Sequence, residues 1–286
     1  MADVVGWLLD PYEFEFMRRA LLALLIVSVV GAIVGAFVVN KGLAFSGDAL
    51  AHSTLAGVAV AFVAGGNVTL GALIAAVLTA LGVGFTRARA RVSYDTAIGI
   101  LFVAMFSIGI LVLSRRTSYT PDLFSFVFGN ILGVSRADLV GASILALAVL
   151  VFVGAFYREL LLVAYDPAVA SAMGVPARAF EYAVLVMIAF AVVIAIKAIG
   201  IVLVNAMLII PAATAGMFAH RLGPIMVYGM AFALVASIVG LHLSYYAGVA
   251  ASPAIVLTAS AIFAVAVLLT SRRRPLEVRP RLEAVE

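Results

Sequence analysis

Asp48 and His52 are an acid and an imidazole four residues apart in the otherwise apolar stretch SGDALAHST (46–54). Residues with this spacing lie on one face of a helix, with Cβ atoms about 6 Å apart. A carboxylate oxygen and an imidazole nitrogen are ligands suited to Mn²⁺, Fe²⁺ or Zn²⁺. Two ligands alone bind weakly, which suits a transport path because the ion must leave again. From the residues alone, a self-satisfied structural pair and an Asp–His proton relay stay open.

Weaker pathway candidates lie in NAMLIIPAATA (205–215) and near residue 242. Pro211 lacks an N–H group, so it should free a backbone carbonyl one turn earlier, near Met207. Asn205 brings a polar side chain to the same segment, and kinked spans often line a pathway. The other interpretation is an ordinary kink in a packed helix. His242 is a further candidate, close to the end of its apolar segment.

The composition of the chain indicates a membrane protein. Of its 286 residues, 66% are hydrophobic and 11% are charged, with a mean hydropathy of +1.25, whereas soluble domains average about 25% charged residues. Apolar windows of roughly 20 residues have the length of a membrane-spanning helix. We therefore expect an all-α polytopic membrane protein with eight or nine transmembrane helices. The predicted spans are 20–39, 48–65, 68–86, 96–113, 138–156, 180–196, 199–218, 225–246 and 252–270.

The apolar segments form one continuous unit. We predict a single transmembrane domain over 1–286, with a membrane-embedded core at 14–270 and a basic tail at 271–286. The segment 121–134 is amphipathic and too short to cross a bilayer, so we interpret it as an interfacial or re-entrant helix. The chain has no cysteine, which excludes disulfides and thiolate metal ligands.

Lysine and arginine predict the orientation of the chain. Placing the clusters RARAR (87–91) and SRRRP (271–275) in the cytoplasm puts twelve basic residues inside and six outside. Cytoplasmic loops carry the excess of Lys and Arg, so we expect a cytoplasmic C-terminus and an external N-terminus. Topology therefore accounts for the net charge of +4, and no nucleic-acid partner is predicted.

The longest polar stretch in the interior of the chain is 157–181, which we predict to be cytoplasmic. Asp166 is placed to cap a short helix that begins at Pro167, and Gly174 is placed to end it. This device is either a connector between spans or a docking helix for a partner. The chain has no phosphate-cradling G-x-x-x-x-G-K-[ST] motif, so a pump built on it would need an energy source from elsewhere.

Six stretches in order make the chain resemble the membrane permease subunits of the zinc/manganese/iron branch of bacterial and archaeal ABC importers. The most specific are GLAFSGDALAHSTLAGVAVAF (42–62) and AIGIVLVNAMLIIPAATA (198–215), and the others are 95–114, 123–139, 165–176 and 240–257. The resemblance covers residues 14–270. It implies that Asp48 and His52 meet the metal, and that 165–176, with Asp166, Pro167 and Gly174, couples to an ATPase.

The resemblance also implies the assembly around the chain. It predicts a homodimer in the cytoplasmic membrane, two separate ATPase subunits at the cytoplasmic face, and an extracytoplasmic protein that delivers the metal. The chain itself would catalyse no reaction, and it would carry the metal as cargo, with no permanently bound cofactor. Competing hypotheses are a proton-coupled secondary transporter, an ABC permease for a larger chelate such as a siderophore, and a structural membrane scaffold.

Overall fold

The computed structural model describes residues 10–114 and 131–271, with the exception of the side chains of residues 197 and 198. Within these ranges the regular structure is entirely helical, and nine helical segments are long and apolar enough to cross a membrane. The predicted all-α membrane fold is confirmed. The spans are α2 (Glu15–Asn40), α3 (Ala44–Val63), α4 (Val68–Ala90), α5 (Tyr94–Ser114), α7 (Arg136–Ala155), the two halves of α10 (Ala177–Phe218), α11 (Leu222–Ala247) and α12 (Ala251–Ser271).

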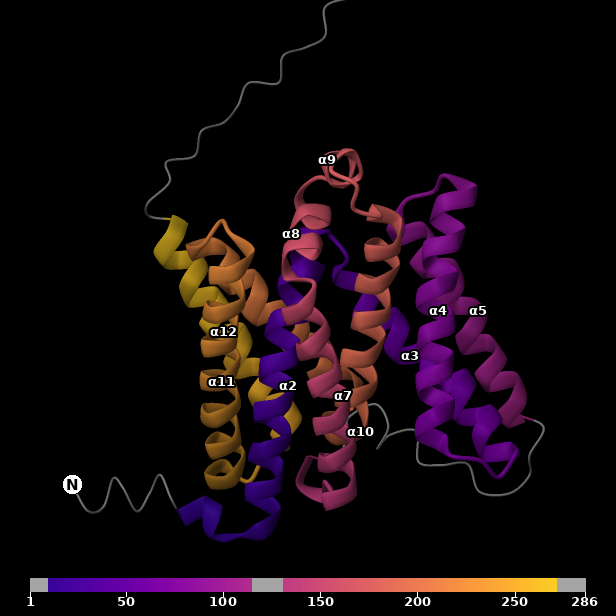
Figure 1. Cartoon of the computed structure of the whole chain (residues 1–286). Coiled ribbons are helices and arrows are strands. Elements are labelled where there is room, and N and C mark those ends of the chain that lie inside the picture. Colours follow the sequence, from indigo (N-terminus) through magenta and orange to yellow (C-terminus); the bar gives the residue numbers. More distant parts are fainter. Residues whose placement is uncertain (1–9, 115–130, 272–286) are drawn as a thin grey trace, which may run out of the picture.

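The short elements lie at the ends of the spans. They are η1 (Asp10–Glu13), η2 (Ile131–Gly133), α8 (Tyr157–Tyr165) and α9 (Pro167–Ala172). Most of the predicted re-entrant segment 121–134 lies outside the described residues, as does the basic tail beyond residue 271. The start of α2 and the end of α12 lie on opposite sides, and α8 and α9 lie on the side where α12 ends (Figure 1).

The helix α10 breaks at Gly200, next to the predicted boundary between the spans 180–196 and 199–218. Gly200 has φ 78° and ψ 165°, a conformation that essentially only glycine adopts. The break divides α10 into spans Ala177–Ile196 and Ile201–Phe218. Pro211 lies inside the second half, where it lacks the N–H that would bond to the Met207 carbonyl. That carbonyl lies against Gly31 of α2, where a Cβ would be 3.1 Å from its oxygen.

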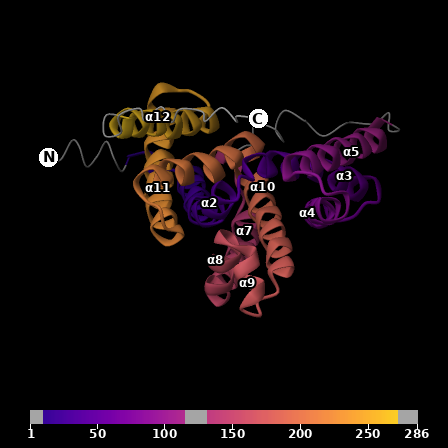
Figure 2. The same cartoon turned by 90° about the horizontal axis from the view of Figure 1, so that it is seen from above.

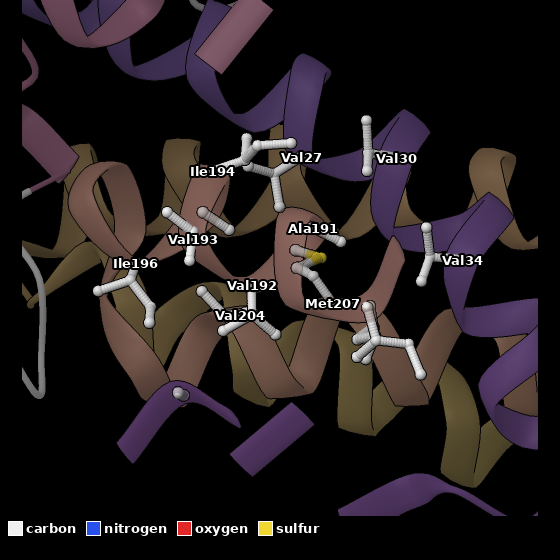
Figure 3. Close-up of a cluster of buried hydrophobic side chains, with 14 of the residues drawn as sticks. Val27, Val30, Val34, Ala191, Val192, Val193, Ile194, Ile196, Val204 and Met207 are labelled. Atoms are coloured by element: carbon white, nitrogen blue, oxygen red, sulfur yellow. The ribbon is translucent and has the colours of Figure 1, made fainter. Parts of the chain in front are cut away.

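The centre of the fold is the contact of α2 with α10. In an 18-residue apolar window of each helix, 67% of the α2 residues are buried, compared with 17% in α5 and 22% in α7. Figure 3 shows the core between these helices, where Val27, Val30 and Val34 face Ala191 and Met207. Seen from above, α3, α4 and α5 lie at one end of the molecule and α11 and α12 at the other, with α2, α7 and α10 between them (Figure 2).

Glycine brings α3 and α4 into backbone contact. A Cβ on Gly57 would lie 1.9 Å from the carbonyl oxygen of Gly71, and a Cβ on Gly71 would lie 2.4 Å from that of Gly57. Real Cβ atoms do not approach this closely, so both positions require glycine. Small residues at helix interfaces are the usual way in which membrane helices gain packing contacts, and here they fix the helix that carries Asp48 against its neighbour.

Candidate functional site

Asp48 and His52 lie on one face of α3, as their spacing predicts. His52 Nε2 is 3.5 Å from Asp48 Oδ1, and the Asp48 side chain is 51% exposed on the single chain. Phe45, one turn earlier, is 72% exposed. A carboxylate on an exposed face of a membrane helix needs a water-filled cavity or a polar partner, because hydrocarbon cannot solvate it.

The second half of α10 adds a third polar side chain to this pair. Asn205 Nδ2 donates a hydrogen bond to Asp48 Oδ1 over 2.8 Å, across 157 residues of sequence. This amide orientation is the favourable one, since the opposite orientation would set two acceptor oxygens against each other. Asn205 Oδ1 is buried and has no hydrogen-bond partner among the described residues. Among the described residues, the side chain of Asn205 is therefore held by its hydrogen bond to Asp48.

Gly47 makes room for this contact. A Cβ on Gly47 would lie 2.7 Å from Asn205 Oδ1 and 3.2 Å from Leu208 Cδ2. The glycine before the aspartate therefore lets α10 approach α3 closely enough for Asn205 to reach Asp48. Asp48 Oδ1 is shared between the amide and the imidazole, and a carboxylate has about four lone-pair sites in all. Capacity to bind a cation remains.

Two phenylalanines of α5 hold the imidazole. The His52 ring centre is 5.6 Å from that of Phe102 and 5.8 Å from that of Phe106, with the second pair edge-on at 90°. Gly109 of α5 lies against the α3 backbone, where a Cβ would be 3.0 Å from the nitrogen of Ala56. Neither phenylalanine was predicted from the sequence. Their spacing of four residues signals a helical face, but only the pairing of α3 with α5 shows what that face contacts.

The other pathway candidates lie elsewhere. The Met207 side chain is fully buried, and it points away from Asn205 because residues two apart on a helix differ by about 200°. Pro211 is also buried. His242 Nδ1 lies 2.8 Å from the Ile238 carbonyl oxygen and 3.3 Å from the Tyr12 hydroxyl. Of the weaker candidates, Asn205 is the one that the structure brings to Asp48.

The predicted capping device in 165–176 is present. The Asp166 carboxylate accepts hydrogen bonds from the backbone N–H groups of Ala168 and Val169, and Pro167 occupies the first helical position of α9. Gly174 has φ 82°, and the N–H of Val175 bonds to the carbonyl of Ala170 over 3.0 Å. These contacts form a Schellman-type end. Local residues therefore fix both ends of this short helix.

Hydrogen bonds tie α8 to the ends of the spans. Lys41, just after α2, donates from Nζ to the Val163 carbonyl over 3.1 Å. Burial lowers the pKa of Lys41 below its ordinary value, against the opposing effect of Glu181. The Tyr165 hydroxyl donates to the His220 carbonyl and accepts from the N–H of Leu222. These contacts connect α8 to the end of α2 and to the start of α11.

The described residues contain no group of three or more His, Cys, Asp or Glu side chains arranged to hold a metal. Asp48 and His52 thus provide two strong metal donors from one chain. This is half of what a four-coordinate site needs. The arrangement suits a cation held in passing, or a site that a second set of ligands completes.

Comparison with known proteins identifies the family. Residues 13–270 match the ABC 3 transport family. The chain is 36% identical over 261 residues to the manganese transport system membrane protein MntC of Listeria monocytogenes, covering 91% of this chain and 93% of the relative. It is 35% identical over 269 residues to the manganese import system permease protein ScaB of Streptococcus gordonii, covering 93% of this chain and 95% of the relative.

Two solved structures are also similar to this chain. PsaBC from Streptococcus pneumoniae, in complex with Fab, aligns with a TM-score of 0.80 at 33% identity, covering 92% of this chain and 95% of that one. A metal-chelate type ABC transporter in an inward-facing conformation aligns with a TM-score of 0.65 at 18% identity, covering 88% and 85%, a likeness of fold alone. On the match over 13–270 and on these relatives, the chain is an integral multi-pass membrane protein that belongs to the ABC 3 transport family.

Proposed function

We propose that the chain is the permease subunit of an ATP-driven importer that carries Mn²⁺, or a similar divalent first-row metal ion, across the cytoplasmic membrane. The observation that carries the proposal is the Asp48–His52–Asn205 cluster, in a chain 35–36% identical to two relatives that are named as manganese transport proteins. One carboxylate and one imidazole suit Mn²⁺, Fe²⁺ and Zn²⁺, and the names of the relatives favour Mn²⁺ among them. The single transmembrane domain houses the whole path.

A second copy of the chain completes the site. The half-exposed Asp48 and the exposed Phe45 share a face of α3. This face is unsuited to lipid because it carries a carboxylate. Two such faces together would supply two carboxylates and two imidazoles to one cation, with Asn205 holding each Asp48. In this arrangement the metal is cargo, and the weak hold of each half-site allows its release.

The dimer has a direct test because the chain contains no cysteine. A single Phe45→Cys substitution cannot form a disulfide within its own chain, and it can form one with a second copy if the two Cα atoms approach within about 7 Å. We expect a cross-linked dimer on mild oxidation in membranes. Exposed Leu78→Cys on α4 is the matched control, and equal cross-linking of both variants would contradict the proposed interface.

The orientation and the partners follow from charge and from α8–α9. The end of α4 and the starts of α8, α10 and α11 lie on the side of α9 (Figure 1), and they carry Arg87, Arg89, Arg158, Arg178 and Arg221. Cytoplasmic loops carry the excess of Lys and Arg, which favours the cytoplasm for this side. The C-terminus then lies in the cytoplasm. Separate ATPase subunits would dock on α9 and hydrolyse ATP, and an extracytoplasmic protein would deliver the metal to the opposite face.

The experiment is uptake of radioactive manganese by cells that express the complete importer. Asp48→Ala and His52→Ala should each lower uptake at least tenfold at limiting manganese, with unchanged amounts of protein in the membrane. Asp95→Ala and His220→Ala remove the same residue types from exposed positions near span ends and should transport normally. Normal uptake by the Asp48 and His52 variants would refute the site.

A further inference from the structure

A basic pocket lies where the end of α4, the start of α5 and the start of α10 meet, on the side of α8 and α9. Its volume is about 600 Å³, within the range of small-molecule sites in proteins. It is separate from the metal pair, since neither Asp48 nor His52 lines it. The charged residues of its wall are Arg87, Arg89, Arg91, Arg178 and Glu181, and the aromatic residues are Phe85, Tyr94 and Tyr182.

Arg87 is built into the pocket wall. Its Nη1 donates to the Tyr94 hydroxyl over 2.9 Å and lies 3.4 Å from Glu181 Oε2, while its guanidinium lies 3.9 Å above the centre of the Tyr94 ring. Glu181 is the sole acid of the wall, so it offsets the charge of Arg87. The wall keeps a net positive charge, which a bound anion would balance.

Three further arginines of the wall have exposed side chains. They are Arg89, Arg91 and Arg178, and within residues 10–114 and 131–271 none of the three forms an ion pair. Arg91 adopts the left-handed conformation at φ 55°, which ends α4 and turns the chain into α5. Guanidinium groups bind phosphate oxygens through paired hydrogen bonds. The pocket therefore offers the chemistry of a phosphate site.

An apolar stripe on α4 leads to this pocket. Its members recur every three or four residues and are 40–60% exposed: Leu70, Ile74, Leu78, Leu81 and Phe85. The next position on the same face is Arg89, whose guanidinium lies 5.9 Å from the Phe85 ring centre. A ligand that fits both features carries an anionic head and an apolar tail along the helix axis. An acidic protein segment would use the arginines but not the stripe.

We propose that this pocket binds the phosphate headgroup of an anionic phospholipid, with the acyl chains lying along the α4 stripe. Basic pockets between membrane helices bind anionic headgroups. The headgroup would bridge α4 to the start of α10, which directly follows α9. The inference does not rest on the metal-import proposal, because it uses neither the metal pair nor the ATPase.

The test is titration of the purified full chain with phosphatidylglycerol, followed by native mass spectrometry. Phosphatidylcholine is the control lipid without a net charge, and glycerol 3-phosphate is the control phosphate without acyl chains. We expect phosphatidylglycerol to bind more tightly than either. Arg89→Gln with Arg178→Gln should weaken it about 25-fold, since about 1 kcal/mol for each arginine near a membrane surface corresponds to roughly fivefold.

The matched control removes two arginines from the same side of the membrane but outside the pocket. Arg158→Gln with Arg221→Gln, both exposed, should keep the affinity of the unmodified chain. The single variant Arg178→Gln, with an expected fivefold loss, serves if the double variant is unstable. Equal loss in the control, equal binding of phosphatidylcholine, or equally tight binding of glycerol 3-phosphate would each overturn the lipid site. If Arg89→Gln with Arg178→Gln lost a protein partner but kept its affinity for phosphatidylglycerol, the pocket would be assigned to that partner.

Discussion

Gly47→Ala tests the contact between Asp48 and Asn205. The new Cβ would lie 2.7 Å from Asn205 Oδ1, several tenths of an ångström inside an ordinary contact. Asn205 has only two side-chain torsions, so it can give way only by withdrawing from Asp48 and lengthening the 2.8 Å hydrogen bond. A hydrogen bond to a charged group is worth about 1.5–3 kcal/mol. Loss of the residues that orient metal ligands typically lowers metal affinity roughly 10–100-fold.

The assay is the manganese concentration that gives half-maximal uptake in cells carrying the importer. Gly47→Ala should raise it roughly 10–100-fold, whereas Gly99→Ala, where a Cβ would meet nothing within 4 Å, should leave it unchanged. Helix propensity favours both alanines by about 0.8–1 kcal/mol. A general effect of adding alanine would therefore appear in both variants.

A double-mutant cycle separates the contact with Asn205 from other effects of Gly47→Ala. Asn205→Ala removes the side chain that the new methyl group would meet, so adding Gly47→Ala to it should cost little more. The two effects should be strongly non-additive, as expected for residues in direct contact. Additive effects would show that this contact does not position Asp48. An unchanged manganese concentration for half-maximal uptake in Gly47→Ala would show the same.

Three further substitutions probe the frame of the site. Gly57→Ala places a Cβ 1.9 Å from an α4 carbonyl oxygen, so overpacking should cost about 1–3 kcal/mol and lower the thermal midpoint in detergent; an unchanged midpoint would contradict the close packing. Phe106→Leu removes the edge contact with His52, worth about 0.5–1.5 kcal/mol. It should raise the manganese concentration for half-maximal uptake about 2–10-fold without loss of expressed protein. An unchanged concentration would leave Phe106 without a positioning role. Asp166→Ala removes the α9 cap, worth about 1 kcal/mol, and should lower recovery of the ATPase with the permease. Asn67→Ala removes the α4 cap on the opposite side and should not lower it, so equal losses would argue against α9 as the docking element.

The sequence predicted those features that short-range physics determines. Hydropathy located the nine spans, because a helix in lipid must satisfy its backbone internally and be apolar outside. The α9 device was also predictable, since Asp166, Pro167 and Gly174 act on their own neighbours. The pairing of Asp48 with His52 needed only helical spacing.

Contacts between spans that are distant in the sequence could not be predicted. The bond from Asn205 to Asp48 crosses 157 residues, and the approach of Phe106 to His52 requires α5 to lie beside α3. Hydropathy divided this segment into the spans 180–196 and 199–218, and the break lies at Gly200, whereas Pro211 stays inside the second span. Proline removes one hydrogen bond and remains compatible with helical angles, whereas Gly200 adopts angles that a helix excludes.

The backbone contact between Gly57 and Gly71 has a mechanical consequence. Where two helices touch through their main chains, no side chain lies between them that could change rotamer and absorb a displacement. Sliding or rolling of α3 against α4 would drive carbonyl oxygens into α-carbons. The contact therefore couples α3, which carries Asp48 and His52, to α4, which ends at the arginines of the basic pocket.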